Sequence, residues 1–325
     1  MSSGDRTIAV INAKGGVGKT TTVANMAGQL AGTYRVLVLD LDPQGHLGVP
    51  YGFYKTETDD AGMRIVDAIQ NDTPLPPPLT DVRPGLDVFP GGARLVRLQG
   101  IEMSGEVLQG VVTSFAEKLT DIADDYDFIL LDCPPGDRLI QQMALAAARY
   151  VLAPIDTGVG ATESLRDHLA PLVTRARREN PELTYLGAIV CKQPKTANRV
   201  LRNTRVRLGE FSEHVPVFES VIRNAVKPAQ DSEQRGQLLH ELAGQLAASN
   251  REQFEKLAAV RAADREASNN GEARARAEQA RSELREFDPI SSTAADLAAD
   301  YRNLAIEVVQ RVASHEDTVP LRKSR

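Results

Sequence analysis

The residues best suited to chemistry in this chain form one glycine-rich segment, Ala13-Lys14-Gly15-Gly16-Val17-Gly18-Lys19-Thr20-Thr21. A β-branched apolar run over residues 7–12 precedes it, and apolar residues at helical spacing follow it up to residue 30. A glycine-rich turn between a strand and a helix directs backbone N–H groups and the positive end of the helix at an anion. The order of these elements predicts a phosphate-binding loop.

The two lysines of this loop differ in how closely they fit the standard P-loop pattern. Lys19 is spaced to contact the β- and γ-phosphates of a nucleotide, and the Thr20 hydroxyl to ligate Mg²⁺. The pattern has glycine where this chain has Ala13, and it does not require a second lysine at position 14. From the spacing alone, Lys14 is either a surface-loop residue or a second cation that faces phosphate.

Two further apolar runs end in acidic residues. Residues 35–40 end at Asp40, with Asp42 just beyond, and residues 128–132 end at Asp132. The carboxyl ends of central parallel strands open onto ligand sites, where an aspartate can orient Mg²⁺ or hold an attacking water. The alternative is that these aspartates only end strands and cap helices. We favour the catalytic interpretation for Asp42 and Asp132 and leave both open for Asp40.

Three segments carry a resemblance to a known family. Residues 14–21 resemble the deviant Walker A box of the ParA/MinD group of ATPases, with Lys14 at the position of its signature lysine. Residues 36–45 resemble the second strand and switch I of the ParA branch, and residues 128–135 its Walker B strand and switch II. The resemblance covers residues 5–232 and resumes over 287–313. It departs from the family at His46, where asparagine is usual.

The resemblance implies a role for each matching residue. The catalytic residues are Lys14, Lys19, Asp42 and Asp132, and Lys14 reaches across a dimer to the partner's nucleotide. Mg²⁺ is held by Thr20, Asp42 and Asp132. ATP is bound by Lys14, Gly15, Gly16, Val17, Gly18, Lys19, Thr20 and Thr21.

Composition limits the class of protein. The chain has 325 residues, two distant cysteines and no apolar run long enough to span a bilayer. These features argue against a disulfide-stabilised secreted protein, a membrane protein and the iron–sulfur carriers of the same superfamily, which need clustered cysteines. We expect a cytoplasmic, nucleoid-associated enzyme without a membrane partner.

Strand and helix patterns alternate along the chain. Strands are predicted over 7–12, 35–40, 86–90, 128–132, 150–154 and 185–190, and helices over 20–31, 104–125, 137–148 and 162–179. This alternation predicts an α/β fold with a doubly wound, mostly parallel sheet and helices on both faces. Residues 72–84, rich in proline, are predicted to be a surface connection.

Basic residues gather between positions 199 and 227. With a net charge of −6, a DNA-binding surface has to be a local basic patch. The same region of the family grips DNA without sequence preference, so the resemblance implies DNA contacts by Arg199, Arg202, Arg205, Arg223 and Lys227. The alternative is a solvated helix face.

The segment 233–286 departs from the family. It is rich in Ala, Glu, Gln, Arg and Leu, lacks proline, and has two helical stripes separated by Asn269-Asn270-Gly271. We predict an inserted α-helical hairpin, either a partner-binding arm or a solvated excursion. The expected organisation is an ATPase domain formed by 1–232 and 287–313, the inserted hairpin, and a flexible basic tail over 314–325.

Together these observations predict a dimerising Mg²⁺-dependent ATPase of the ParA type. In its ATP state it would bind nonspecific DNA, and hydrolysis stimulated by a ParB-like centromere-binding partner would release it, segregating a plasmid, phage or chromosome. Three alternatives remain. They are a ParA-like ATPase that positions a protein cargo, a MinD-like membrane-associated ATPase, and a DNA-binding regulator that uses ATP only as a switching ligand.

Overall fold

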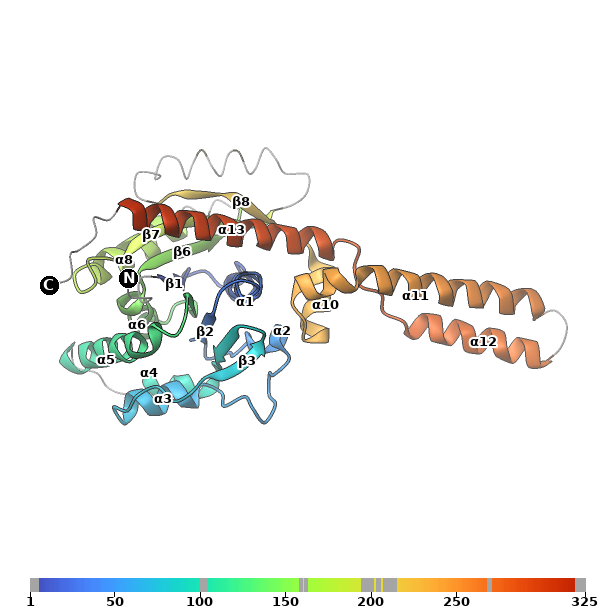
Figure 1. Cartoon of the computed structure of the whole chain (residues 1–325), viewed down its shortest axis with the longest axis horizontal. Coiled ribbons are helices and arrows are strands. Elements are labelled where there is room, and N and C mark those ends of the chain that lie inside the picture. Colours follow the sequence, from blue (N-terminus) through green and yellow to red (C-terminus); the bar gives the residue numbers. More distant parts are fainter. Residues whose placement is uncertain are drawn as a thin grey trace.

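Eight strands form one sheet in the order β3-β4-β2-β5-β1-β6-β7-β8 (Figure 1). The computed structural model describes residues 6–99, 105–157, 160, 163–193, 202, 206, 215–267 and 271–318. All neighbouring strands run parallel except β3 and β4 at one edge. The strands are β1 (Thr7–Val10), β2 (Val36–Asp40), β3 (Leu79–Arg83), β4 (Leu86–Phe89), β5 (Phe128–Asp132), β6 (Tyr150–Ile155), β7 (Thr184–Gln193) and β8 (Val217–Arg223).

Helices cover both faces of the sheet, which confirms the predicted fold class (Figure 1). One face packs against helices α3 (Met63–Gln70), η2 (Ala93–Leu95), α4 (Val96–Gln99), α5 (Gly105–Ala123), α6 (Arg138–Ala147), η3 (Ser164–Leu169) and α8 (Ala170–Ala176). The other packs against α1 (Lys19–Leu30), α2 (Gly48–Tyr51) and α13 (Ala294–Thr318). The strands β1, β2 and β5 are buried along their whole length, which explains their continuous apolar sequences.

Several elements were not predicted from the sequence, among them the short helices α2 and α4. Helix α3 and strand β8 were missed, and the predicted connection over 72–84 contains β3. Strand β3 begins directly after the last of the consecutive prolines, Pro78, and pairs with β4 through a tight turn at Gly85, whose φ is 75°. Because β3 is an exposed edge strand, it lacks the apolar alternation that marks a strand in sequence.

The C-terminal helix α13 packs lengthwise on the sheet. Leu304, Val308 and Val312 are buried in the core on that face, whereas Ile306 is half exposed. The helix continues to Thr318, beyond the boundary predicted at residue 313, and residues 319–325 of the predicted tail lie outside the described part. Among the described residues, none of the helices combines the length and apolar content needed to cross a bilayer.

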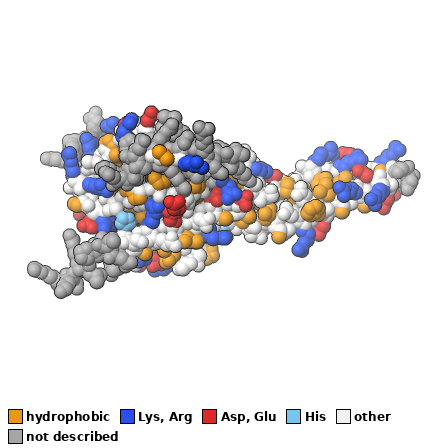
Figure 2. Space-filling view, turned by 90° about the horizontal axis from the view of Figure 1, so that it is seen from above, with side chains coloured by type: hydrophobic (Ala, Val, Ile, Leu, Met, Phe, Trp, Pro, Cys, Tyr) orange, Lys and Arg blue, Asp and Glu red, His pale blue; other side chains and the backbone are white. Residues whose placement is uncertain are grey.

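The predicted hairpin is present as two antiparallel helices that project from the body (Figure 1). Helix α10 (Val226–Arg235) leads into α11 (Leu239–Glu266), and α12 (Gly271–Glu286) returns beside it. The Arg281 guanidinium reaches the Asp264 carboxylate across the pair at 2.7 Å. On the face that Figure 2 shows, acidic and basic side chains are intermixed along the projecting part, so this face does not carry a single sign of charge.

The base of the hairpin belongs to the core of the domain. Leu238 and Leu242 are fully buried, and Leu239 is 1% exposed. Leu246 is the last α11 side chain that packs against a core cluster, and Phe254 further out is 71% exposed. The expected boundary at residue 233 therefore cuts through packed structure, and the free arm starts inside α11.

We expect the outer hairpin to be removable and its base to be essential for stability. Replacing residues 259–284 with a short glycine–serine linker should leave the midpoint of thermal unfolding nearly unchanged, because those helices pack mainly on each other. A thermal melt measures the effect of the truncation, and a truncated chain that fails to fold would contradict this expectation.

Leu242→Ala should lower the free energy of unfolding by about 2–5 kcal/mol through loss of a buried side chain. Urea denaturation measures the effect of Leu242→Ala.

Candidate active site

The glycine-rich loop lies at the carboxyl end of β1, in the middle of the sheet. It runs from Ile11 to Gly18, and α1 begins at Lys19. The first turn of α1 has neither a side-chain cap nor an acidic residue, so its N–H groups are free to bind an anion. The sequence and the structure agree on this element.

Two glycines give the loop its open shape. Gly16 has a φ of 71° and Gly18 a φ of 96°, a backbone region that L side chains rarely adopt. A Cβ added at Gly15 or Gly16 would meet no atom within 4 Å, so it would project into the space that the loop encloses. The loop is a cradle in which a phosphate chain can approach the backbone.

Lys19 is folded back over this cradle. Its side chain is 6% exposed, and its Nζ donates to the Lys14 carbonyl oxygen at 3.1 Å. Burial lowers the pKa of the Lys19 ammonium, and the carboxyls of Asp132 and Asp42 oppose that shift. The cation is held beside the space that the β- and γ-phosphates would occupy.

Asp132 at the end of β5 is the least satisfied polar side chain of the site. It is fully buried, and no donor among the described residues makes an ordinary hydrogen bond to either carboxyl oxygen, although the Thr20 hydroxyl lies close enough to favour the charged form. Burial raises its pKa to about 7, with Asp42 adding to the shift and the Thr20 hydroxyl and Lys19 opposing it. An orphaned buried carboxyl beside Thr20 and Asp42 fits the shell of a divalent cation.

Asp40 has a structural role, which decides the question that the sequence left open. Its two oxygens accept hydrogen bonds from the N–H groups of Asp42 at 2.9 Å and Leu47 at 3.2 Å. Burial, and then the neighbouring Asp132, raise its pKa well above the usual range. Asp40 therefore fixes the loop that carries Asp42, whose own carboxylate accepts from the Gln44 N–H at 2.9 Å.

Gly91 explains how this loop fits against the sheet. A Cβ at that position would lie 2.5 Å from the Asp40 Cγ, closer than atoms can approach. Gly45 approaches in turn, since its Cβ would lie 3.0 Å from the Gly91 carbonyl oxygen. The glycine pair after β4 was a signal that sequence reasoning did not use.

Lys14 forms an ion pair with Asp156, which follows β6. Its side chain is 47% exposed, so the ammonium lies at the surface. Buried Asn12 sets the course of the backbone here: its Oδ1 accepts from the Lys14 N–H at 2.9 Å and from the Ser164 hydroxyl at 2.6 Å, and its Nδ2 donates to the Pro154 carbonyl at 2.7 Å. Asp156 and Asn12 were not predicted as site residues.

Two cavities flank the loop. One of about 270 Å³ lies beside Gly18 and Thr21 and is lined by Asn224 and by residues of α10. It has the position and size for a base attached to a nucleotide in the cradle. The other, of about 730 Å³, lies beside Lys14 between α6 and the segment 163–175.

Two of the predicted DNA-contacting residues, Arg223 and Lys227, lie in ion pairs with acidic residues of the same chain. The Arg223 guanidinium binds Asp300 at 2.7 Å and Asp296 at 2.9 Å, and the Lys227 ammonium binds Asp231 at 2.9 Å. These two cations are thus paired within the chain. Arg202 is exposed, and Arg199 and Arg205 lie outside the described residues.

Comparison with known proteins agrees with this site. The sequence profile of a family described as an AAA domain matches residues 5–185. The chromosome partitioning protein ParA of Myxococcus xanthus is 34% identical over 227 residues, which cover 68% of this chain and 76% of that protein. The chromosome-partitioning ATPase Soj of Thermus thermophilus is 34% identical over 231 residues, 69% of this chain and 84% of that protein.

Solved structures give the same fold. Apo McdA from Cyanothece superposes with a TM-score of 0.62 over 73% of this chain and 93% of that one, at 20% identity. A cobyrinic acid a,c-diamide synthase from Mycobacterium smegmatis, with bound ATP analog and magnesium, has a TM-score of 0.57 and 26% identity, covering 68% of this chain and 85% of that one. The profile match over more than half of the sequence, together with the two partition proteins, shows that this chain belongs to the ParA family of partition ATPases.

Proposed function

We propose that this ATPase requires Mg²⁺, dimerises around ATP, holds DNA of any sequence in that state and releases it when a partner stimulates hydrolysis. The cargo would be a plasmid, phage or chromosome, and the partner a ParB-like centromere-binding protein. The observation that carries the proposal is the open glycine cradle, with Lys19 bent over it and the orphaned Asp132 at its side.

Lys19 would bind the phosphates by exchanging partners. Its Nζ now donates to a neutral carbonyl, and a phosphate oxygen would add the attraction of a full negative charge. The N–H groups of the loop and of the first turn of α1 would bind the remaining phosphate oxygens, with Thr21 at the α-phosphate. The base would enter the 270 Å³ cavity beside Thr21.

The residues around Asp132 fit a magnesium ion. Thr20, Asp132 and Asp42 would hold it, Asp42 through water. When bound, Mg²⁺ neutralises charge that develops on the transferred phosphoryl group. Asp42, which Asp40 and Gln44 hold in place, would orient the attacking water.

Lys14 is available for a second protomer. It is surface-exposed and held by an ion pair that solvent screens, so moving it away from Asp156 costs little. A lysine that enters the partner's active site would stabilise phosphoryl charge there, which makes turnover depend on dimerisation. The membrane-positioning alternative needs an exposed apolar face on α13, and the face with Leu304 and Val308 is buried instead.

The two lysines should separate binding from turnover. Lys19→Ala should weaken ATP affinity by roughly 100-fold, because it removes the buried cation beside the β- and γ-phosphates. Lys14→Ala should bind ATP nearly as well as the parent but lose DNA- and partner-stimulated hydrolysis. Isothermal titration and phosphate release measure the two effects, and normal turnover by Lys14→Ala would refute the cross-dimer role.

Asp132 should destabilise the nucleotide-free protein at neutral and alkaline pH. Because its pKa is about 7 in the folded state and about 4 in an unfolded chain, the folded state holds the extra proton between these values, and stability falls as the pH rises through that window. Asp132→Asn should therefore raise the free energy of unfolding by roughly 1–3 kcal/mol at pH 8 and by much less at pH 4. A difference between parent and variant that is constant across this range, measured by urea denaturation, would contradict the assignment.

DNA contacts should depend on Arg199, Arg202 and Arg205 rather than on the paired cations. With ATP, affinity for unrelated DNA sequences should be similar and should fall steeply with salt, because bound counterions are released. Neutralising the three arginines together should weaken binding without changing ATP affinity. Arg223→Ala is the comparison: it leaves Asp300, which is 9% exposed, without its main partner and should cost about 1–3 kcal/mol of stability. A stable Arg223→Ala protein that has lost DNA binding would return Arg223 to the DNA surface.

A further inference from the structure

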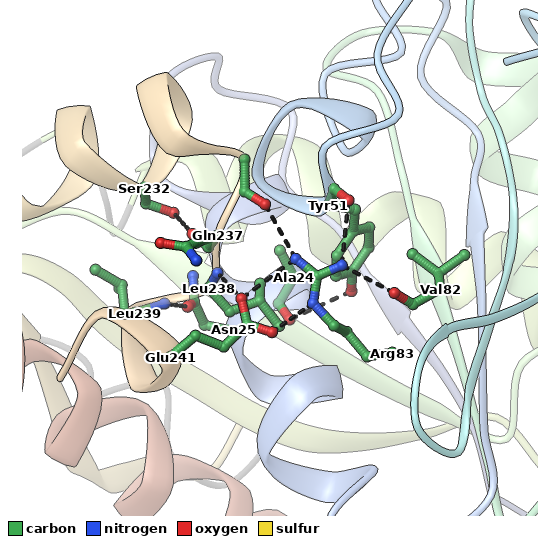
Figure 3. A network of polar contacts seen from close by, with 11 residues as sticks. Ala24, Asn25, Tyr51, Val82, Arg83, Ser232, Gln237, Leu238, Leu239 and Glu241 are labelled. Carbon is green, nitrogen blue, oxygen red and sulfur yellow. Dashed lines mark hydrogen bonds and ion pairs between the residues drawn. The ribbon is translucent and has the colours of Figure 1, made fainter. Parts of the chain in front are cut away.

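The base of the hairpin is joined to the active-site elements by one arginine (Figure 3). Arg83, the last residue of β3, forms an ion pair with Glu241 in the first turn of α11. Its guanidinium also donates to the carbonyl oxygens of Gly236 at 3.0 Å and of Tyr51 at 3.2 Å. Glu241 in turn accepts from the Leu238 N–H at 2.7 Å. One cation thus links β3, the end of α2, the turn after α10 and the start of α11.

A second side chain links the base of the hairpin to α1, the helix that follows the phosphate loop. Asn25 of α1 is 2% exposed, and its Oδ1 accepts from the Leu239 N–H at 3.0 Å. Its Nδ2 donates to the carbonyl of Thr21, a residue of the glycine-rich segment, at 3.0 Å. From the same junction, the Tyr51 hydroxyl donates to the Ala24 carbonyl at 3.3 Å (Figure 3). The first N–H of α11 is therefore bound by a side chain of α1, the helix that begins at the end of the phosphate loop.

Packing at the junction leaves no room for sliding. A Cβ on Gly28 of α1 would lie 2.4 Å from the Leu238 Cδ1, and a Cβ on Gly236 would lie 2.8 Å from the Gly52 Cα. Gly52 ends α2, the helix that follows the loop carrying Asp42. The contact between Gly236 and Gly52 is backbone to backbone, so a shift of α2 would press on the turn that leads into α11, whereas α1 meets that turn through the Leu238 side chain.

Both ends of the hairpin are also attached to α10, which lines the cavity next to the phosphate loop. At its exit, the Asp288 carboxylate binds Lys227 of α10 at 3.0 Å. Just beyond, the Ser291 N–H donates to the Asp231 carboxylate at 2.9 Å. A ligand that moves α10 would act on both ends of the arm together.

We propose that the hairpin is a lever coupled to the nucleotide site, with Arg83 and Asn25 as its positioning residues. The inference rests on the proposed nucleotide site. Helix α11 has 28 residues, about 42 Å at the rise of an α-helix, so a small tilt at its base becomes a larger displacement at its tip. Coupling is reciprocal, so a change at the junction also alters nucleotide affinity.

The first experiment measures the orientation of the arm. Spin labels are attached at Ala262→Cys, on the exposed outer part of α11, and at Glu117→Cys on α5. Pulsed electron paramagnetic resonance measures the distance between them, and the two native cysteines should not be labelled because they are buried. Adding Mg²⁺ and a non-hydrolysable ATP analogue should change the mean distance by roughly 2 Å or more. Binding of the analogue without a change of distance would overturn the lever alone. Failure of the parent to bind the analogue would overturn the proposed function together with it.

The second experiment tests the junction. Arg83→Gln should weaken analogue affinity by about 5-fold or more and abolish the change in distance, and Arg83→Lys should restore part of both because it can still pair with Glu241. Arg64→Gln is the matched control, since it breaks an ion pair of similar exposure, with Asp60, away from the junction. A purely structural role would lower thermal stability in both glutamine variants and leave analogue affinity unchanged. Equal affinities in Arg83→Gln and Arg64→Gln would overturn the coupling.

Discussion

Two carboxyl groups buried side by side at the ends of neighbouring strands are the constraint on which this site depends. The register of β2 and β5 places Asp40 opposite Asp132, and both are excluded from solvent. Asp40 is stabilised by two backbone N–H groups, and Asp132 has no such partner. A buried carboxyl without a close partner is costly in its charged form, which raises the pKa of Asp132 to about 7. In the proposed function, a bound cation would offset this cost.

The lysines around this pair have partners that a nucleotide can replace. Lys19 donates to a backbone carbonyl, and Lys14 pairs with a partly exposed carboxylate. The Lys19 contact is to an uncharged oxygen and the Lys14 ion pair is partly exposed to solvent, so in the proposed function both would give way to phosphate. The side chains of Asn12 and Asn25, by contrast, make buried hydrogen bonds that a nucleotide would not replace. These bonds join elements that are far apart in the sequence. The site combines replaceable cations with a rigid frame.

Local sequence patterns identified the strands and helices in which burial follows a regular pattern along the element. The buried strands and the amphipathic helices of the domain could be predicted because their periodicity reflects one burial pattern. Strand β3 could not, because it is an edge strand without apolar alternation, and the base of the hairpin could not, because its burial depends on residues distant in the chain. Leu239 and Leu242 lie in a polar, alanine-rich segment, yet contacts with α1 and the C-terminal part of the chain bury them.

The sequence by itself determined the chemistry: a glycine-rich loop with Lys14, Lys19 and Thr20, and acids at the ends of two apolar strands, because spacing along one strand–loop–helix unit fixes which groups face a phosphate. Only the tertiary structure decided which partner each charge takes. In the folded chain Lys14 pairs with Asp156, and Arg223 pairs with acidic residues of α13. Asp40 accepts hydrogen bonds from two backbone N–H groups, whereas Asp132 accepts none from the backbone of the described residues. The physical reason is that ion pairs and burial depend on distances in space, which the folded sheet sets between residues far apart in the chain.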